Sequence, residues 1–134
     1  MIKTAKRESG FNSYIQNRAG APYYGYFQMG REEIKRTTGL TVEQFRNDPV
    51  AQILGAVKLY EMNIKTIKAI GVYDIGKKKG YSDDALVSGA WMGGPGGVKK
   101  YLLGLGDPSD SHWYKNGKGG SSVGKIMNNW KENE

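Results

Sequence analysis

Hydrophobic residues follow a helical pattern most clearly between Pro49 and Ile70. Large apolar side chains recur there every three or four positions, which is the spacing of one face of an α-helix. They are Val50, Ile53, Leu54, Val57, Tyr60, Ile64 and Ile67. Asn47 or Asp48 can cap such a helix, and proline suits its first position. We therefore predict a central helix over residues 49–70 that buries this apolar stripe.

Shorter helices are predicted on both sides of the central one. The segment REEIKRTT at 31–38 is followed by a glycine, and TVEQ at 41–44 has the capping-box pattern that opens a helix. Further along, Ser82 can cap a helix that ends at the glycines 93–94. Pro95 can then begin the next helix, because proline suits the first helical position.

The remaining segments complete a mainly α domain. A last helix is predicted over about 122–131. Its inward residues are Val123, Ile126, Met127 and Trp130. GKKKG at 76–80 is predicted to be a solvated connector and 106–122 a loop, while strand-like alternation is limited to a small hairpin between Tyr14 and Met29. The length of 134 residues suits one domain, 1–134.

Composition narrows the possible chemistry. The chain has no cysteine and a single histidine, His112, which excludes disulfides, thiolate chemistry and a multi-histidine metal site. It also has no apolar run of 18 residues or more, so we expect no membrane insertion. The net charge of +7 favours a polyanionic partner, such as nucleic acid, an anionic lipid surface or bacterial cell wall.

Three segments hold residues suited to chemistry. RESGFN at 7–12 places a single carboxylate, Glu8, ahead of an aromatic ring. APYYGYFQM at 21–29 is more aromatic than a solvated turn requires, and AWMGGPGGV at 90–98 is a glycine-rich helix end that another chain can approach closely. Aromatic faces, an amide and accessible backbone groups are what a sugar polymer needs. These segments therefore predict a carbohydrate-binding cleft.

One acid beside such a cleft fits glycosidic bond cleavage. Burial against apolar rings raises the pKa of a carboxyl group, which can then donate a proton near neutral pH. Taken alone, Glu8 has a simpler interpretation as a surface residue. Gln28 and Tyr24 have core packing as an alternative to the favoured functional role, and Trp91 can equally pack in the core or line the cleft. For Phe27 the core position is the preferred interpretation.

The three segments together resemble the motifs of the soluble lytic transglycosylase family, a branch of the lysozyme-like superfamily. The family's E-S-x-F-N motif is matched by residues 8–12, its G-L-M-Q segment by 25–28, and its A-Y-N-A-G-P-G-A-V segment by 90–98. The order and the distances agree, and the likeness covers roughly residues 5–103. Three motifs in register are much more specific than one.

This resemblance implies a lysozyme-like fold and a defined reaction. Members of the family cut the β-1,4 bond between N-acetylmuramic acid and N-acetylglucosamine in peptidoglycan. Glu8, as the only catalytic carboxylate, would protonate the glycosidic oxygen and then take the proton of the 6-hydroxyl, which closes a 1,6-anhydro ring. Most glycosidases use two carboxylates instead. The resemblance also implies a set of substrate-binding residues without a metal or cofactor. They are Asn17, Tyr24, Gln28, Trp91, Met92 and Tyr114.

The chain departs from the family's pattern at several positions. Trp91 replaces a tyrosine, Met92 replaces an asparagine, and Asn17 stands where a serine is usual. The late tyrosine that orients the glutamate has Tyr114 and Tyr101 as its candidates here. Only seven residues precede the glutamate, where the family has a full helix. We expect either a domain excised from a longer chain or the terminal helix around Ile126 and Trp130 in the place of that helix.

Three alternative functions stay open. A hydrolysing muramidase of the goose type shares the fold, but it carries an aspartate where this chain has Gly30, and the loop 13–29 contains no acid. A non-catalytic wall-binding module would tolerate the changes at Met92 and Asn17. Nucleic-acid binding rests on positive charge alone and predicts a steep salt dependence.

The expected partners and location follow from the resemblance. We expect a monomer that acts on peptidoglycan glycan strands, with no nucleic-acid partner. The site of action would be the periplasm or the extracellular cell wall. The opening MIKTAKRESG lacks a secretory signal, which suits a phage virion or lysis protein, or a piece of a larger cell-wall or conjugation protein.

Overall fold

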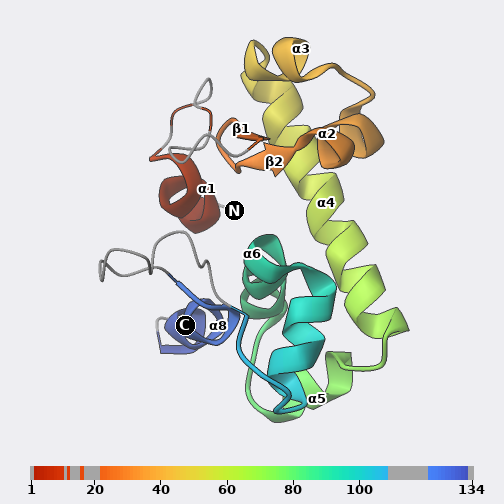
Figure 1. Ribbon diagram of the computed structural model, residues 1–134, viewed down its shortest axis with the longest axis vertical. Helices are drawn as coiled ribbons and strands as arrows, with labels where there is room; N and C mark the ends of the chain where they lie inside the picture. The colour runs from red at the N-terminus through yellow and green to blue at the C-terminus, as the bar shows by residue number, and fades with distance from the viewer. Residues whose placement is uncertain (1, 11, 13–15, 17–21, 109–120, 133–134) are drawn as a thin grey trace. The chain divides into compact units, whose positions relative to one another are not determined.

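The computed structural model describes residues 2–10, 12, 16, 22–108 and 121–132. These residues are mainly helical and include a small two-stranded antiparallel sheet, as the sequence predicts (Figure 1). The chain divides into two compact units, Met1–Glu61 and Met62–Glu134, called unit 1 and unit 2 below. Among the described residues, no helix combines the length and the apolar character that crossing a membrane requires.

Unit 1 holds a short helix, a hairpin and a group of three helices. The elements are α1 (Ile2–Ser9), β1 (Tyr23–Tyr24), β2 (Met29–Gly30), α2 (Arg31–Thr38), α3 (Val42–Arg46) and α4 (Pro49–Ala69), the last of which continues into unit 2. In the hairpin Tyr23 pairs with Gly30 and Tyr24 with Met29. Gln16 forms a further isolated bridge with Tyr24, so three segments meet at this tyrosine.

The helix ends of unit 1 follow the capping signals of the sequence. α2 stops at Gly39, whose φ of 72° is left-handed. The Thr41 hydroxyl accepts a hydrogen bond from the Gln44 amide at 3.2 Å, and the Gln44 side chain accepts one from the Thr41 amide at 3.0 Å. Asp48 caps α4 by accepting a hydrogen bond from the Ala51 amide at 3.0 Å. Local chemistry therefore sets these boundaries.

The predicted buried face of α4 is wrong over its first half. Val50, Ile53, Leu54 and Val57 are 65%, 51%, 65% and 43% exposed, respectively. Over this half the buried residues of α4 lie on a different face. They are Gln52, Gly55, Ala56 and Leu59. In the second half Ile67 of the predicted stripe is fully buried, as expected.

Close packing explains which face of α4 is buried within unit 1. A Cβ atom on Gly55 would lie 2.9 Å from the Thr38 side chain and 3.1 Å from the Thr37 hydroxyl, so only glycine allows this approach. Gln52 is fully buried on the same side and satisfies its amide with backbone groups. A face of small and hydrogen-bonded residues therefore packs inward, and the aliphatic face is left at the surface.

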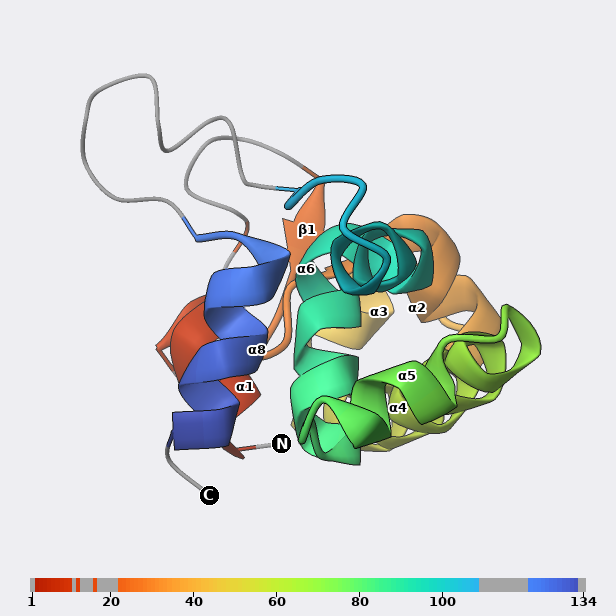
Figure 2. The ribbon, with the colours of Figure 1, turned by 90° about the horizontal axis from the view of Figure 1, so that it is seen from below.

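Unit 2 is built on α5 (Tyr73–Lys78), α6 (Asp83–Leu102) and α8 (Val123–Glu132). As predicted, the Ser82 hydroxyl caps α6, and a kink at Gly94 (φ 72°, ψ 168°) separates its two parts. α8 lies beside α6 (Figure 2) and turns Val123, Ile126 and Met127 inward, which also confirms the sequence prediction.

One prediction for unit 2 is wrong. The segment at 76–80 is not simply a solvated connector, because α5 includes residues 76–78 and Gly76 is buried. A Cβ atom on Gly76 would lie 2.7 Å from the Leu86 side chain. The lysines that follow it are exposed. Because they give the segment the composition of a solvated turn, the sequence pattern does not indicate that this glycine is packed.

Candidate functional site

The predicted site residues fall in both units. Glu8, Tyr24 and Gln28 belong to unit 1, whereas Trp91 and Met92 belong to unit 2. The other two lie outside the described residues. They are Asn17 and Tyr114. The site is therefore described one unit at a time, beginning with the acid.

Glu8 lies on the buried face of α1. Thr4 and Ala5 are 3% and 5% exposed. Position 8 is four residues after Thr4 and three after Ala5, so on a helix it lies on the same face as both. Glu8 occupies that position and is partly buried, whereas Lys3 and Lys6 are exposed. A solvated glutamate would be expected on the lysine face. Partial burial thus distinguishes Glu8 from the exposed lysines of the same helix.

The end of α1 is fixed immediately after this glutamate. Ser9 is 7% exposed, and its hydroxyl donates a hydrogen bond to the Ala5 carbonyl at 2.9 Å. Gly10 follows with a φ of 61°, and the amide of Asn12 then donates to the Ser9 carbonyl at 3.3 Å. The serine and the glycine therefore close the helix and set where the chain leaves it. They shape the surroundings of Glu8 without reacting.

Gln28 has the most unusual backbone of the hairpin. Its φ is 50°, and it is the one non-glycine residue with positive φ in the described part of the chain. Its amide donates to the Gly25 carbonyl at 3.2 Å, and its side-chain Nε2 donates to the same carbonyl at 3.0 Å. A left-handed glutamine costs about 1–2 kcal/mol. Strain of this kind is often found at functional sites, and here it falls on the glutamine of the predicted motif.

Gln52 holds the hairpin in place and was missed by the sequence analysis. Its Oε1 accepts a hydrogen bond from the Tyr26 amide at 2.9 Å, and its Nε2 donates to the Phe45 carbonyl at 2.9 Å. A Cβ atom on Gly25 would lie 2.6 Å from this Oε1, so the turn needs glycine there. An amide among the apolar residues in the first turn of the predicted helix was the available signal, since a polar side chain there needs a partner if it is buried.

The hairpin aromatics divide between core and surface. Phe27 is 5% exposed and belongs to the core, as preferred from the sequence. Tyr23 is 45% exposed, and Tyr24 is partly buried with the Arg46 guanidinium 5.6 Å from its ring centre. The described hairpin therefore offers the rings of Tyr23 and Tyr24 as surfaces on which a sugar could stack.

In unit 2 the glycine-rich segment has a packing role. Trp91 and Met92 are partly buried, and Met92 packs against the hydrophobic core of this unit. A Cβ atom on Gly93 would lie 2.5 Å from the side chain of Val123 in α8. At least part of this glycine-rich segment thus serves the contact between α6 and α8. That a substrate chain approaches this segment stays a prediction.

Tyr101, one candidate for the late tyrosine, is held by a polar network inside unit 2. Its hydroxyl accepts a hydrogen bond from Asn128 Nδ2 at 3.0 Å, and the Tyr81 hydroxyl donates to Asn128 Oδ1 at 2.7 Å. Burial, followed by the hydrogen bond with Tyr101, raises the pKa of the Tyr81 hydroxyl above its usual range. This arrangement joins α6 to α8 and gives Tyr101 a structural role.

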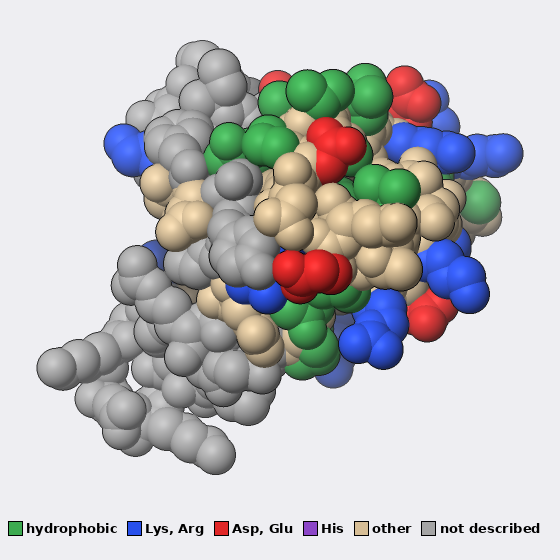
Figure 3. Space-filling model, turned by 90° about the horizontal axis from the view of Figure 1, so that it is seen from above, with side chains coloured by type: hydrophobic (Ala, Val, Ile, Leu, Met, Phe, Trp, Pro, Cys, Tyr) green, Lys and Arg blue, Asp and Glu red, His purple; other side chains and the backbone are tan. Residues whose placement is uncertain are grey.

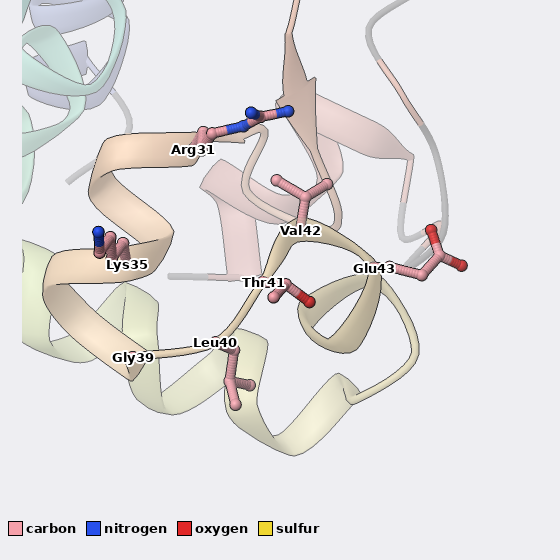
Figure 4. Close-up of a pocket in the computed structure, with 7 residues that line it drawn as sticks. All are labelled: Arg31, Lys35, Gly39, Leu40, Thr41, Val42 and Glu43. Atoms are coloured by element: carbon pink, nitrogen blue, oxygen red, sulfur yellow. The ribbon is translucent and has the colours of Figure 1, made fainter.

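A separate pocket of about 600 Å³ lies in unit 1 between α2 and α3 (Figure 4). It is lined by Arg31, Lys35, Gly39, Leu40, Thr41, Val42 and Glu43. None of these is a predicted site residue. No group of three or more His, Cys, Asp or Glu side chains suited to a metal ion occurs within the described ranges.

Comparisons with models of protein families, with curated proteins and with solved structures gave no match. The candidate site therefore rests on the residues and their geometry. In unit 1 it consists of a partly buried acid at a helix end and a strained glutamine in an aromatic hairpin that Gln52 anchors.

Proposed function

We propose that this protein is a peptidoglycan lytic transglycosylase with a lysozyme-like fold, which acts in the periplasm or the extracellular cell wall. The observation that carries the proposal is the position of Glu8. It is a partly buried carboxyl group in the last turn of α1, inside the E-S-x-F-N pattern that resembles the family's catalytic motif. The mainly α architecture with a small hairpin is compatible with this assignment.

Glu8 is suited to begin the reaction as an acid. It lies partly buried in the last turn of α1, and a general acid acts by donating its proton to the leaving oxygen. In the proposed reaction Glu8 gives its proton to the glycosidic oxygen as the bond to the muramic acid C1 breaks. The resulting carboxylate then accepts the proton of the muramic acid 6-hydroxyl, whose oxygen bonds to C1. Glu8 is thereby restored as an acid, and no second carboxylate is required.

The hairpin provides the surface that would hold the sugar. The rings of Tyr23 and Tyr24 can stack on pyranose faces, and backbone groups of the turn can bind hydroxyl or acetamido groups. Gln28 keeps a left-handed backbone, and the hydrogen bond from its side chain to the Gly25 carbonyl holds this turn. We infer that this strained conformation is maintained because it shapes the sugar-binding surface.

A hydrolysing muramidase is the second candidate, because one carboxylate does lie at the end of the hairpin. Glu33 Oε1 accepts a hydrogen bond from the Gly30 amide at 2.9 Å. This bond closes the start of α2 and occupies one oxygen of the acid. If Glu33 instead positions a water molecule, Glu33→Gln removes hydrolysis. If its role is only to cap α2, the variant keeps both its activity and most of its stability, because a glutamine Oε1 can also accept the Gly30 hydrogen bond.

Lysis of purified peptidoglycan by matched variants tests the proposal. Glu8→Gln keeps the size of the side chain and removes the acid, so we expect turbidity clearance to fall by at least 10²-fold, the usual contribution of a general acid. Glu32→Gln makes the same change on an exposed residue of α2 and should leave the rate unchanged. Co-sedimentation with insoluble peptidoglycan should be the same for all three proteins.

Three results would contradict the proposed activity. Binding without any lysis by the wild type would identify a non-catalytic wall-binding module. Equal lysis by the wild type and Glu8→Gln would remove Glu8 as the acid. Binding to DNA that weakens steeply with salt, in the absence of binding to peptidoglycan, would favour the nucleic-acid alternative.

A further inference from the structure

The first half of α4 carries an exposed aliphatic stripe. It consists of Val50, Ile53, Leu54 and Val57, each 43% to 65% exposed. Figure 3 looks onto the end of unit 1 that holds α3 and the start of α4, and it shows hydrophobic side chains at the surface among charged ones. Isolated exposed aliphatic residues are ordinary, but four within two turns of one helix form a patch, and such patches mark interaction sites.

The spacing of the stripe is that of a helix–helix interface. Its members lie at intervals of three, one and three residues, so they share one face over two turns, about 10 Å of helix axis. This is the a, d, e, a pattern of a helix that packs against another helix. Charged residues border the stripe, with Asp48 before it and Lys58 and Glu61 after it. All three are exposed. The stripe therefore has a negative charge at its N-terminal end and a positive charge followed by a negative one at its C-terminal end.

We propose that a second copy of this chain covers the stripe, with the two α4 helices antiparallel about a two-fold axis. With the axis between Ile53 and Leu54, each Val50 lies opposite the Val57 of the second copy. Such an interface is isologous, because the same patch serves both copies. The inference is independent of the proposed function, and it replaces the monomer expected from the sequence.

Charge complementarity selects this antiparallel arrangement. It brings Lys58 of each copy near Asp48 of the other, and Glu61 near the first turn of the other α4, where the helix dipole favours a carboxylate. A parallel pair would instead place Lys58 beside Lys58 and Glu61 beside Glu61. An anionic lipid surface fits less well, because carboxylates stand at both ends of the stripe and would be repelled by it.

The dimer should be weak. A stable interface of standard size buries about 800 Å² on each partner, and two helical turns supply only its centre. We therefore expect a dissociation constant on the order of micromolar. Most of the binding free energy should come from Ile53 and Leu54, since they lie closest to the two-fold axis.

Sedimentation equilibrium of the 134-residue protein over about 1–500 μM tests the proposal. We expect wild type to pass from monomer to dimer, Leu54→Asp to stay monomeric at every concentration, and Lys58→Glu to weaken the dimer about tenfold. Leu105→Asp is the matched control, because Leu105 is a leucine of similar exposure that is not part of the stripe, and this variant should dimerise as wild type does. Far-UV circular dichroism confirms that each variant is folded.

Three outcomes would overturn the proposed dimer. The first is a wild type that stays monomeric throughout, and the second is a dimer that survives Leu54→Asp. The third is a protein that stays monomeric but binds vesicles containing phosphatidylglycerol through Leu54, which would make a lipid surface the occupant of the stripe.

Discussion

The first half of α4 and the α6–α8 pair have equally regular apolar spacing, but only the second buries the side chains that the spacing selects. Val123 and Met127 of α8 are fully buried against α6. Ile53 and Leu54 of α4 are more than half exposed. The difference is that unit 2 contains a helix which fits the aliphatic face, whereas unit 1 packs against the opposite side of α4.

Small and hydrogen-bonding residues decide which face is buried in both regions. In α6, Gly89 and Gly93 allow the side chains of α8 to come close, since a Cβ atom on either would lie within 3 Å of them. In α4, Gly55 and Gln52 have the corresponding role toward α2, α3 and the hairpin. Apolar periodicity therefore locates a helix, while the positions of close approach determine its orientation.

The largest expected difference between the two regions is in the stability lost when one leucine of each is replaced by alanine. Leu86→Ala in α6 should lower the free energy of unfolding by about 2–5 kcal/mol, because a fully buried side chain leaves a cavity. Leu54→Ala in α4 should change it by less than about 0.5 kcal/mol. Urea unfolding at a concentration well below dimer formation measures both. Equal losses would show that the α4 stripe is buried within the monomer.

The polar anchor of unit 1 should have the next largest effect. Gln52→Leu leaves the Tyr26 amide without its partner, at about 1–3 kcal/mol, and removes one hydrogen bond from the Phe45 carbonyl, which still accepts from the Asp48 amide at 3.1 Å. Gln44→Leu, on an exposed residue of the α3 capping box, should cost only about 1 kcal/mol. Thermal unfolding compares the two variants. A Gln52→Leu protein as stable as wild type would contradict the anchoring role.

The tyrosine network of unit 2 predicts a pH dependence at the alkaline end. Because burial and the Tyr101 hydrogen bond raise the Tyr81 pKa above the ordinary value of 10.0, the unfolded state loses this proton first as pH rises. The stabilisation is fully present below about pH 10 and is lost as pH rises from there through the folded-state pKa.

Tyr81→Phe tests this linkage. It should cost about 1 kcal/mol at neutral pH, where the hydrogen bond to Asn128 is lost, and it should flatten the decline above about pH 10. Tyr23→Phe, on an exposed tyrosine, is the control and should change neither quantity. Unfolding free energies of the three proteins, measured between pH 8 and about pH 11, test this prediction. If the unfolding free energy of Tyr81→Phe declined with pH as steeply as that of wild type, the pH dependence would not come from Tyr81.

The smallest effect on stability is expected at Gln28. Gln28→Gly relieves the left-handed strain of about 1–2 kcal/mol but removes the side-chain bond to the Gly25 carbonyl, so the net change should be within about 1 kcal/mol. Lysis of peptidoglycan should nevertheless fall markedly, because the side chain that holds the turn is gone. Full lytic activity in Gln28→Gly would mean that the strain has no role in function.

Local signals predicted much of the fold. Capping residues such as Asp48 and Ser82, and the Gly94–Pro95 pair that interrupts α6, fixed helix boundaries because their effect is confined to a few neighbouring residues. The buried face of α4 and the packing of Gly76 were not predictable in this way. Both depend on residues that are distant in sequence, and a pattern within one helix does not contain them.

The candidate site was predicted only at the level of residue identity. The sequence singled out Glu8 and Gln28 from their motifs. It did not reveal that Glu8 shares a helix face with Thr4 and Ala5, because helix α1 is too short for its periodicity to be recognised. It also missed Gln52, since its contribution comes from hydrogen bonds to segments 7 and 26 residues away in the chain.

We propose above that Glu8 carries out a cyclising cleavage of peptidoglycan. Mass spectrometry of the muropeptides released from purified peptidoglycan by wild type and by Glu8→Gln tests it most directly. The wild type should release fragments that end in 1,6-anhydromuramic acid, each lighter by one water than a hydrolysis product, and Glu8→Gln should release almost none. Reducing muramic acid ends alone, or anhydro products undiminished in Glu8→Gln, would contradict the claim.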